Sequence, residues 1–348
     1  MNPSPHDFRM PAEWERHAGT WLTWPHRRSD WPGKFSPIPW VYAEIIRTLT
    51  RFEKVNLLVL GQEEEAVARR ILNANHADLS NAVFHRFTSD RSWMRDSGPI
   101  FVKNEAGERT VLDWHFNAWA KYPDWTQDNQ IPSFVTKLRG LPSVRPEHRS
   151  RGIVLEGGSI DVNGAGLMLT TEECLMSNVQ ERNPTFDRSD YEHVFADYLG
   201  VEKVLWLNRG IAGDDTHGHV DDLARFVNPN TVVVVVEPNP QDDNYEPLQE
   251  NLKRLKGMTD TNGKRLNIVP LPMPSPIVFR KQRLPASYAN FYIANGVVLV
   301  PTFNDRQDRV ALGILAELFP DREVVGIHCV DLVWGLGTLH CMTQQEPA

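Results

Sequence analysis

Short runs of β-branched and apolar residues occur in pairs along the chain, and a polar turn that contains Asn separates the members of each pair. Asn near Gly or Pro readily adopts the backbone conformations of tight turns between antiparallel strands. The pattern therefore predicts four β-hairpins, with turn residues Asn104, Asn163, Asn228 and Asn295. Successive turns are 59, 65 and 67 residues apart (163 − 104, 228 − 163 and 295 − 228).

A helix-forming segment follows each of the last three hairpins, and another short apolar run follows each segment. Leu, Ile and Ala recur in these segments every three or four residues, as in a helix that packs one face against a core. The segments are 191–200, 245–257 and 308–320, and the runs are 201–207, 266–272 and 322–328. The chain therefore repeats a unit of hairpin, helix and strand, and a repeat of about 65 residues is typical of repeat architectures.

Roughly five such units fit the chain, and the series begins with a helical segment at 41–52 and a strand at 55–60. The segment at 17–25 lacks a preceding partner strand, and the segment at 339–345 lacks a following one. Pairing these two segments would complete one unit and leave no open sheet edge. We therefore expect residues 1–348 to form a single α/β domain, a five-bladed ββαβ propeller with pseudo-fivefold symmetry. A doubly wound α/β sheet is the alternative, but it requires parallel crossovers where this chain has hairpins.

Composition and charge exclude several classes of protein. Hydrophobic residues make up 41% and charged residues 24% of the chain, as in a globular protein. No apolar run approaches the roughly 20 residues of a membrane span. The net charge is −8 and basic residues are scattered, which argues against nucleic acid as a partner. Three cysteines without a CxxC pair disfavour disulfides and fit a reducing cytoplasm. A homodimer is plausible.

Polar residues that are able to take part in catalysis occur at equivalent places in successive units, where the chain enters the first strand of a hairpin. Their spacings are 60, 63, 71 and 51 residues (156 − 96, 219 − 156, 290 − 219 and 341 − 290). Equivalent positions of a closed ring converge on its axis, so we expect these residues to share one cavity. They are Asp96, Glu156, His219 with Asp221, Asn290 and Cys341.

Each of these residues also has a purely structural interpretation. Asp96 precedes Gly98-Pro99 and could simply form a turn. Glu156 precedes two glycines and could be a solvated acid in a tight turn. We expect Cys174 and Cys329 to be small core residues and His340 to pack or support rather than to catalyse. If these residues converge on one cavity, a purely structural explanation of all of them together is much weaker than a structural explanation of any one residue.

The predicted set suits chemistry on a cation. A thiol and an imidazole supply a nucleophile and an acid–base group. Acyl transfer needs donors for developing negative charge, so the carboxylates are in excess for it. They match a guanidinium, which is planar, permanently charged and able to pair with carboxylates through forked N–H groups. Asp96 and Asp221 would hold that group facing Cys341, and on an extended strand His219 and Asp221 would point the same way.

Together the motifs resemble those of the agmatine deiminase family, which includes bacterial peptidylarginine deiminases and belongs to the pentein, or guanidino-group-modifying, superfamily. The motifs are MPAEWERHAGTWLTWP, WMRDSGP, LEGGSIDVNG, TTEECL, GDDTHGHVDDLARF, NYE and HCMTQQEP, and they span nearly the whole chain. The resemblance implies a five-bladed propeller. It also implies hydrolysis of a small cationic guanidino substrate, agmatine, to N-carbamoylputrescine and ammonia without a metal or another cofactor.

The resemblance further implies a role for each matched catalytic residue. Cys341 attacks the guanidinium carbon and forms a covalent amidino intermediate. Asp96 and Asp221 hold the guanidinium nitrogens. His219 protonates the leaving ammonia and then activates the water that releases the ureido product.

The resemblance also implies residues that hold the substrate. Trp93 covers the methylene chain, Glu156 and Asn290 shape the cavity, and Asp215 is the candidate partner of the distal amine. The chain departs from the family pattern at Leu336 and Thr338, and by a shortened GDDT loop followed by His217. These departures concern the tail of the substrate.

Three other functions remain open at this point. The same chemistry could act on arginine or peptidylarginine, with Arg95 as a donor to the carboxylate or peptide. A metal hydrolase could use the dense loop around the HxH motif. A non-catalytic binding protein of the same fold is the third. The candidate ligands of the metal hydrolase are His217, His219, Asp214, Asp215 and Asp221.

Overall fold

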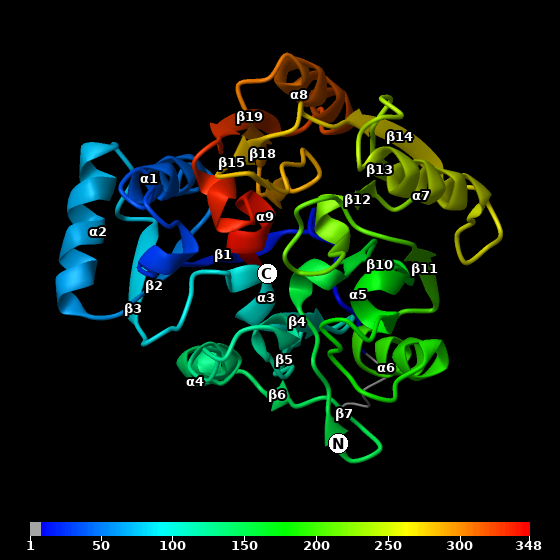
Figure 1. Cartoon of the computed structure of the whole chain (residues 1–348). Coiled ribbons are helices and arrows are strands. Elements are labelled where there is room, and N and C mark those ends of the chain that lie inside the picture. The colour runs from blue at the N-terminus through cyan, green and yellow to red at the C-terminus, as the bar shows by residue number, and fades with distance from the viewer. Residues whose placement is uncertain (1–7) are drawn as a thin grey trace.

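The computed structural model describes residues 8–348 and has a mixed α/β fold built from several small sheets (Figure 1). The largest sheet within these residues has four strands. A doubly wound fold would require one large parallel sheet, so this alternative does not describe residues 8–348. No helix in this part of the chain combines the length and apolar character of a membrane span.

Four of the sheets contain three strands each and share one pattern. The first two strands form an antiparallel hairpin, and the third lies parallel to the second. The predicted hairpins at the four asparagines are therefore confirmed. The sheets are β4 (Ile100–Lys103), β5 (Arg109–Leu112) and β6 (Ser143–Val144); β9 (Asp161–Val162), β10 (Leu167–Thr171) and β11 (Lys203–Leu207); β12 (Ala224–Asn228), β13 (Thr231–Val236) and β14 (Asn267–Pro272); and β17 (Tyr292–Ala294), β18 (Val297–Thr302) and β19 (Glu323–His328).

Long helices lie on the outside of the molecule, and short helical turns lie nearer its centre (Figure 1). Helix α6 (Arg188–Leu199) follows a capping box at Asp187 and is terminated by Gly200, whose left-handed backbone suits glycine. The long helices are α1 (Ile38–Leu49), α2 (Gln62–Ala74), α4 (Ile131–Arg139), α6 (Arg188–Leu199), α7 (Tyr245–Gly257) and α8 (Gln307–Leu318). The short turns are α3 (Met94–Ser97), α5 (Glu172–Met176), α9 (Leu339–Met342), η5 (Gly157–Ser159), η6 (Val220–Asp222) and η7 (Leu332–Gly335).

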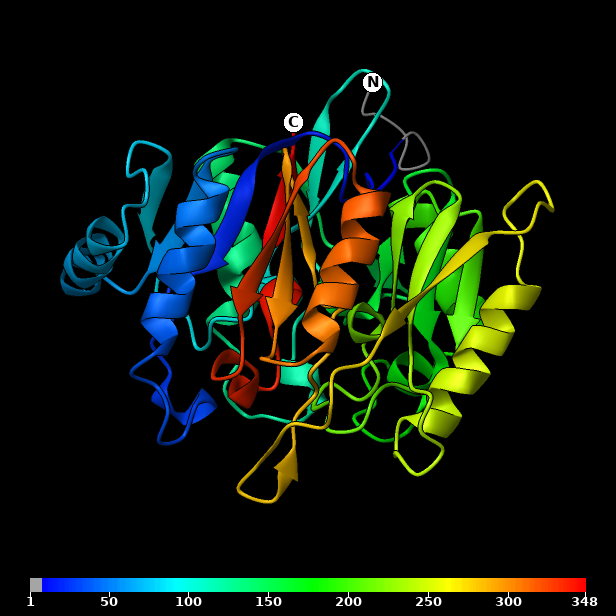
Figure 2. The same cartoon turned by 90° about the horizontal axis from the view of Figure 1, so that it is seen from above.

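Two further hairpins are small. They are formed by β7 (Glu147–His148) with β8 (Arg151–Gly152), and by β15 (Val278–Phe279) with β16 (Gln282–Arg283). Figure 2 shows the second hairpin projecting beyond the rest of the molecule.

The remaining sheet joins the two ends of the described chain. Its order is β20 (Gln344–Pro347), β1 (His17–Thr23), β2 (Val55–Val59) and β3 (Ala82–Arg86). β20 pairs antiparallel with β1 in the register Thr20–Gln345 and Trp21–Gln344. The predicted pairing of the segments at 17–25 and 339–345 is confirmed. Cys341 itself, however, lies in helix α9 just before the strand.

The buried carboxylate of Glu346 stabilises the pairing of β20 with β1. Glu346 is 2% exposed and accepts hydrogen bonds from the indole of Trp21 at 2.8 Å, from Arg109 at 3.1 Å and from Arg139 at 3.0 Å. Trp21 belongs to β1, while the two arginines belong to β5 and to the end of α4. The carboxylate therefore ties the terminal strand to two sheets.

Glu346→Ala should lower the free energy of unfolding by about 3 kcal/mol, because it leaves buried donors and guanidinium groups without their partner. Urea-induced unfolding measures the change. Glu323→Ala is the matched control, since Glu323 pairs with Arg51 at a side chain that is 47% exposed. That control should cost less than about 1 kcal/mol. Equal losses in the two variants would contradict this role of Glu346.

Candidate active site

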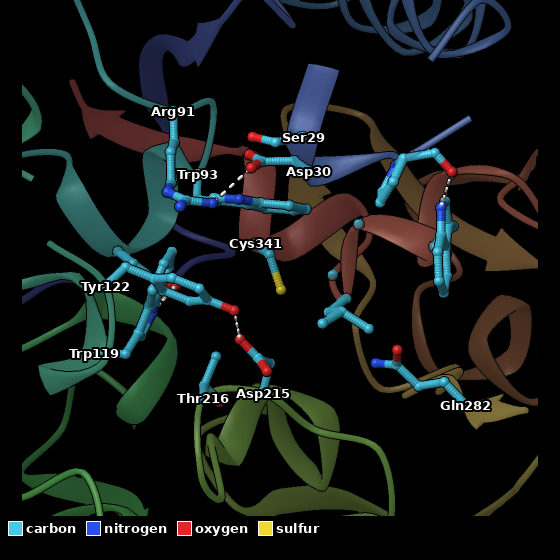
Figure 3. Close-up of a pocket in the computed structure, with 16 residues that line it drawn as sticks. Ser29, Asp30, Arg91, Trp93, Trp119, Tyr122, Asp215, Thr216, Gln282 and Cys341 are labelled. Carbon is cyan, nitrogen blue, oxygen red and sulfur yellow. Dashed lines mark hydrogen bonds and ion pairs between the residues drawn. The ribbon is translucent and has the colours of Figure 1, made fainter. Parts of the chain in front are cut away.

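A cavity of about 250 Å³ opens beside Cys341 (Figure 3). The sulfur of Cys341 points into it, with Trp93 on one side and Asp215 across from it. The lining residues are Ser29, Asp30, Pro32, Arg91, Trp93, Asp96, Trp119, Tyr122, Asp215, Thr216, Gln282, Trp334, Gly335, Leu336, Gly337 and Cys341.

The six polar residues expected to share one cavity come together through short helical turns, but only Asp96 and Cys341 among them line the cavity. α3 contacts α9 and η5, and η5 contacts η6. These turns carry or adjoin Asp96, Glu156, Asp221 and Cys341. The expectation of an extended strand at His219 and Asp221 is wrong, because His219 caps η6 and Asp221 lies within it. The two side chains still reach the same site.

The Cys341 thiol is buried among polar groups. The Asn290 amide donates to its sulfur at 3.1 Å, and the thiol lies 3.8 Å from a carboxylate oxygen of Asp221. Burial and the carboxylates of Asp221, Asp222 and Asp96 raise the pKa of the Cys341 thiol well above its usual value. A cation bound among these carboxylates would offset their charge and favour the thiolate.

The imidazole of His219 lies between two carboxylates and is 1% exposed. Its Nδ1 is 3.8 Å from Asp96, its Nε2 is 3.9 Å from Glu156, and neither nitrogen has a hydrogen-bond partner. Burial opposes protonation, but Asp96, Cys174 and Glu156 outweigh it and raise the pKa of His219 well above its usual value. Gly158 permits this arrangement, because a Cβ there would lie 2.5 Å from Nδ1. The imidazole is therefore placed to hold a proton that it can give up.

The Asp96 carboxylate is held by two donors. The indole of Trp119 donates to it at 2.9 Å and the backbone N–H of Gly158 at 3.1 Å. Burial raises the pKa of Asp96 to about 6, against the opposing charge of His219. The position of Trp119 depends on unusual backbone, since Ala118, Trp119 and Ala120 all have positive φ between 52° and 58°. Such strain persists only where the surrounding structure enforces it.

The Asp221 carboxylate is oriented by His340. Nδ1 of His340 lies 2.7 Å from one oxygen of Asp221, and Nε2 lies 2.8 Å from the carboxylate of Glu13. Burial would raise the pKa of Asp221, but the hydrogen bond and charge of His340 outweigh it and lower that pKa. The other oxygen of Asp221 is buried without a partner and can accept hydrogen bonds from a ligand. His340 thus supports the site, as the sequence suggested.

Glu156 and Asn290 lie beside the residues just described, Glu156 next to His219 and Asn290 next to Cys341. Burial would raise the pKa of Glu156, but Arg182, whose Nε is 3.0 Å away, and His219 lower it to about 2. Asn290 accepts from Thr338 and donates both to Cys341 and to Asp222. Burial and the neighbouring carboxylates raise the pKa of Asp222 well above its usual value. The core of the site therefore holds carboxyl groups whose pKa values are shifted in opposite directions.

The outer part of the cavity holds Trp93 and Asp215. Trp93 stacks near Trp31, with ring centroids 5.5 Å apart, and a Cβ at Gly337 would lie 2.7 Å from its ring. Asp215 accepts from Lys121 at 2.5 Å and from the hydroxyl of Tyr122 at 2.6 Å. The charge of Asp215 is thus already partly neutralised. Leu336, one of the departures from the family pattern, lines the cavity with a left-handed backbone (φ 70°).

The other candidates from the sequence lie outside this set. Arg95 is buried and pairs with Glu13 and Gln345. Asp214 accepts backbone hydrogen bonds from its own loop, and His217 contacts the hydroxyl of Ser177. They do not form a common ligand set with His219. Within residues 8–348, the cluster with metal-ligand spacing is Glu156, Cys174 and His219.

Sequence reasoning missed several residues of the site. Glu13 belongs to the MPAEW motif and Cys174 to the TTEECL motif, so each lies in a segment that carries the family resemblance. Cys174 and Cys329 are buried in apolar clusters as expected, but Cys174 also adjoins His219. No sequence signal marks the contact of Trp119 with Asp96, because it depends on strained local backbone.

Known proteins resemble this chain over its whole length. The family model described as Porphyromonas-type peptidyl-arginine deiminase matches residues 9–347. An agmatine deiminase of Pseudomonas fluorescens is 36% identical over 369 residues, which cover 99% of this chain and 97% of the relative. The agmatine deiminase of Enterococcus faecalis has a solved structure with TM-score 0.90 and 34% identity, covering 100% of this chain and 98% of that one. The putative arginine deiminase of Porphyromonas gingivalis gives TM-score 0.87 and 35% identity, with 98% of each chain covered.

Asp221→Asn should lower the pH at which iodoacetamide alkylates Cys341 at half its maximal rate. A nearby negative charge disfavours the thiolate, so removal of that charge lowers the pKa of the thiol. Asn290→Ala should shift the midpoint upward, since it removes a donor to the sulfur. Mass spectrometry of the labelled peptides gives the rates, and labelling of buried Cys329 reports any loosening of the fold. Shifts in the opposite directions would contradict the described electrostatics.

Proposed function

The chain belongs to the Porphyromonas-type peptidyl-arginine deiminase family, and we propose that it is an agmatine deiminase. In this reaction agmatine and water give N-carbamoylputrescine and ammonia. One observation carries the proposal. A buried thiol and an unpartnered imidazole lie among carboxylates at the end of a small cavity, in a chain that resembles agmatine deiminases over its whole length. An amide or ester substrate would leave the carboxylates without a partner.

The proposed reaction begins with the guanidinium group held between Asp96 and Asp221. The free oxygen of Asp221 accepts from one nitrogen, and Glu156 has a second free oxygen nearby. The bound cation lowers the cost of forming the thiolate, and Cys341 releases its proton to solvent. The sulfur then forms a bond to the guanidinium carbon.

His219 acts as the general acid in the first half of the reaction and as the general base in the second half. It gives a proton to the departing nitrogen as the C–N bond breaks, which leaves an amidino group on Cys341. The neutral imidazole then takes a proton from water, whose oxygen attacks the same carbon. The C–S bond breaks, the Cys341 thiolate takes the proton that the protonated ureido group releases, and the ureido product leaves.

We propose that the five main sheets form the five blades of one domain. Four of them share the antiparallel–parallel order, and the fifth joins β1 with β20. An amidinotransferase from Microseira wollei, at 12% identity and TM-score 0.53, shares the general fold alone. The closed propeller predicted from the sequence would explain why the turns that carry or adjoin Asp96, Glu156, Asp221 and Cys341 meet.

Free arginine or peptidylarginine is the second candidate substrate, because Arg91 lines the cavity and its Nε has no partner. The Nη atoms of Arg91 already pair with Asp30 at 2.6 Å and with Asp124 at 3.0 Å. Arg95, proposed from the sequence for this role, is occupied by Glu13. The description of the family and the structure described as a putative arginine deiminase support this alternative.

Colorimetric measurement of ureido product should show at least tenfold higher kcat/KM for agmatine than for arginine or an arginine-containing peptide. Cys341→Ala should reduce turnover by at least about a thousandfold, because the covalent route is lost. Cys329→Ala, which changes a buried thiol outside the site, should keep most of the activity. A tenfold preference for arginine would assign the alternative substrate, and substantial turnover by Cys341→Ala would overturn the mechanism.

Asp215→Asn should raise KM for agmatine about tenfold with little change in kcat, since a charged hydrogen bond to the distal amine contributes about 1.5 kcal/mol or more to binding. Asp124→Asn is the matched control, because Asp124 pairs with Arg27 and Arg91 but does not line the cavity. Steady-state kinetics separate the two parameters. A loss confined to kcat, or equal effects of the two changes, would argue against Asp215 as the tail partner.

A further inference from the structure

Three buried side chains of different chemistry face one another behind the cavity. One carboxylate oxygen of Glu156, the sulfur of Cys174 and a ring nitrogen of His219 all lie within 4.8 Å of one another. Glu156 is 0% exposed, and Cys174 and His219 are each 1% exposed. In the proposed deiminase reaction Cys174 contacts no reacting atom and acts only on the surroundings of His219.

The local structure fixes Cys174 against His219. Thr171 caps helix α5 by accepting from the backbone N–H of Cys174 at 3.0 Å. The same hydroxyl donates to the carbonyl of Gly218 at 2.5 Å, directly before His219. One side chain therefore holds the thiol and the imidazole in a constant relative position.

The cluster contains polar atoms that no protein group satisfies. Both ring nitrogens of His219 and Oε2 of Glu156 are buried without a hydrogen-bond partner, and Nε2 and Oε2 are 3.9 Å apart. A buried polar atom without a partner costs about 1–3 kcal/mol. Ligand atoms about 2.0–2.3 Å from a tetrahedral zinc ion lie about 3–4 Å from one another, so a small inward movement would bring the three into range.

We propose that Glu156, Cys174 and His219 form a binding site for a zinc-like divalent ion, and that an ion bound there inhibits the enzyme. The inhibition half of this inference rests on the proposed function. An imidazole, a thiolate and a carboxylate suit Zn²⁺ or Co²⁺ and do not suit Mg²⁺ or Ca²⁺, which prefer oxygen ligands.

The binding step balances without any oxidant or reductant. The Cys174 thiol releases its proton to solvent as the metal–sulfur bond forms, and any proton on Nε2 of His219 leaves in the same way. Bonds form to Nε2 of His219 and to Oε2 of Glu156. One thiolate and one carboxylate neutralise the charge of the ion, while Arg182 keeps its ion pair with the other oxygen of Glu156. The imidazole keeps its Nδ1–H but has no free nitrogen to take up a second proton, so it cannot act as the acid–base group and the proposed reaction stops.

The unpartnered atoms of His219 and Glu156 could instead be satisfied by substrate alone. Cys174 separates these explanations, because a guanidinium substrate does not need its sulfur and the metal does. Cys329 supplies a matched control, as a buried free cysteine that packs in a different apolar cluster.

The first experiment titrates Co²⁺ into full-length protein that carries Cys341→Ala, so that the proposed nucleophile cannot bind the ion. We expect one equivalent to bind and to give a sulfur-to-cobalt charge-transfer absorption. That band should vanish when Cys174→Ala is added and persist when Cys329→Ala is added. Zn²⁺ should displace Co²⁺, with at least about 100-fold weaker binding after Cys174→Ala, since even outer-shell changes cost about 10–100-fold. Circular dichroism and urea unfolding of each variant check that it is folded.

The second experiment measures agmatine turnover with and without Zn²⁺. Zinc should inhibit the wild-type enzyme, a chelator should restore its activity, and the inhibition constant should rise at least tenfold in Cys174→Ala but not in Cys329→Ala. A charge-transfer band that survives Cys174→Ala, or equal zinc inhibition of both variants, would overturn the proposal. Absence of agmatine turnover would refute the proposed function instead, and the cobalt spectrum would still decide the metal site.

Discussion

The buried carboxylate of Glu13 is the interaction on which the centre of the molecule depends. Its oxygens pair with Arg95 at 3.1 Å and Arg225 at 2.9 Å, contact His340 at 2.8 Å and accept the backbone N–H of Ile293 at 2.8 Å. Burial would raise the pKa of Glu13, but Arg225, His340 and Arg95 hold it well below its usual value. An unpaired charge at this depth would be very costly, so these partners must assemble together.

This network connects the fold to the proposed chemistry. His340 lies between Glu13 and Asp221, so the position of the carboxylate next to Cys341 depends on a residue near the start of the described chain. Arg225 pairs with Glu13 and also with Asp161. The pair of Arg225 in β12 with Asp161 in β9 links two strands of different sheets. Acidic and basic side chains therefore alternate outward from the thiol, and this order stabilises several buried carboxyl groups beside one another.

Local patterns explain what the sequence could predict. The four hairpins rest on turn chemistry at Asn104, Asn163, Asn228 and Asn295, and the pairing of β1 with β20 followed from two strands that lacked partners. The meeting of Asp96, Glu156, His219, Asp221, Asn290 and Cys341 could be predicted because equivalent positions of a repeat share a location.

Individual contacts could not be predicted in the same way. The alignment of Cys174 with His219 depends on one threonine hydroxyl shared between two loops. The helical turn at His219 replaced the extended strand expected there, because short polar segments take their conformation from the structure around them. The left-handed backbone around Trp119 is likewise enforced by its surroundings.

The sheet that joins β1 to β20 has a consequence for synthesis on the ribosome. Trp21 and its partner Glu346 are 325 residues apart, so the growing chain makes β1 long before its neighbour exists. The carboxylates of the site emerge first, and Cys341 emerges only shortly before β20. A nascent chain can therefore fold its individual hairpins early, as local contacts form fastest. It lacks the proposed nucleophile until β20 is also about to appear, so the complete site can form only after most of the described chain has been made.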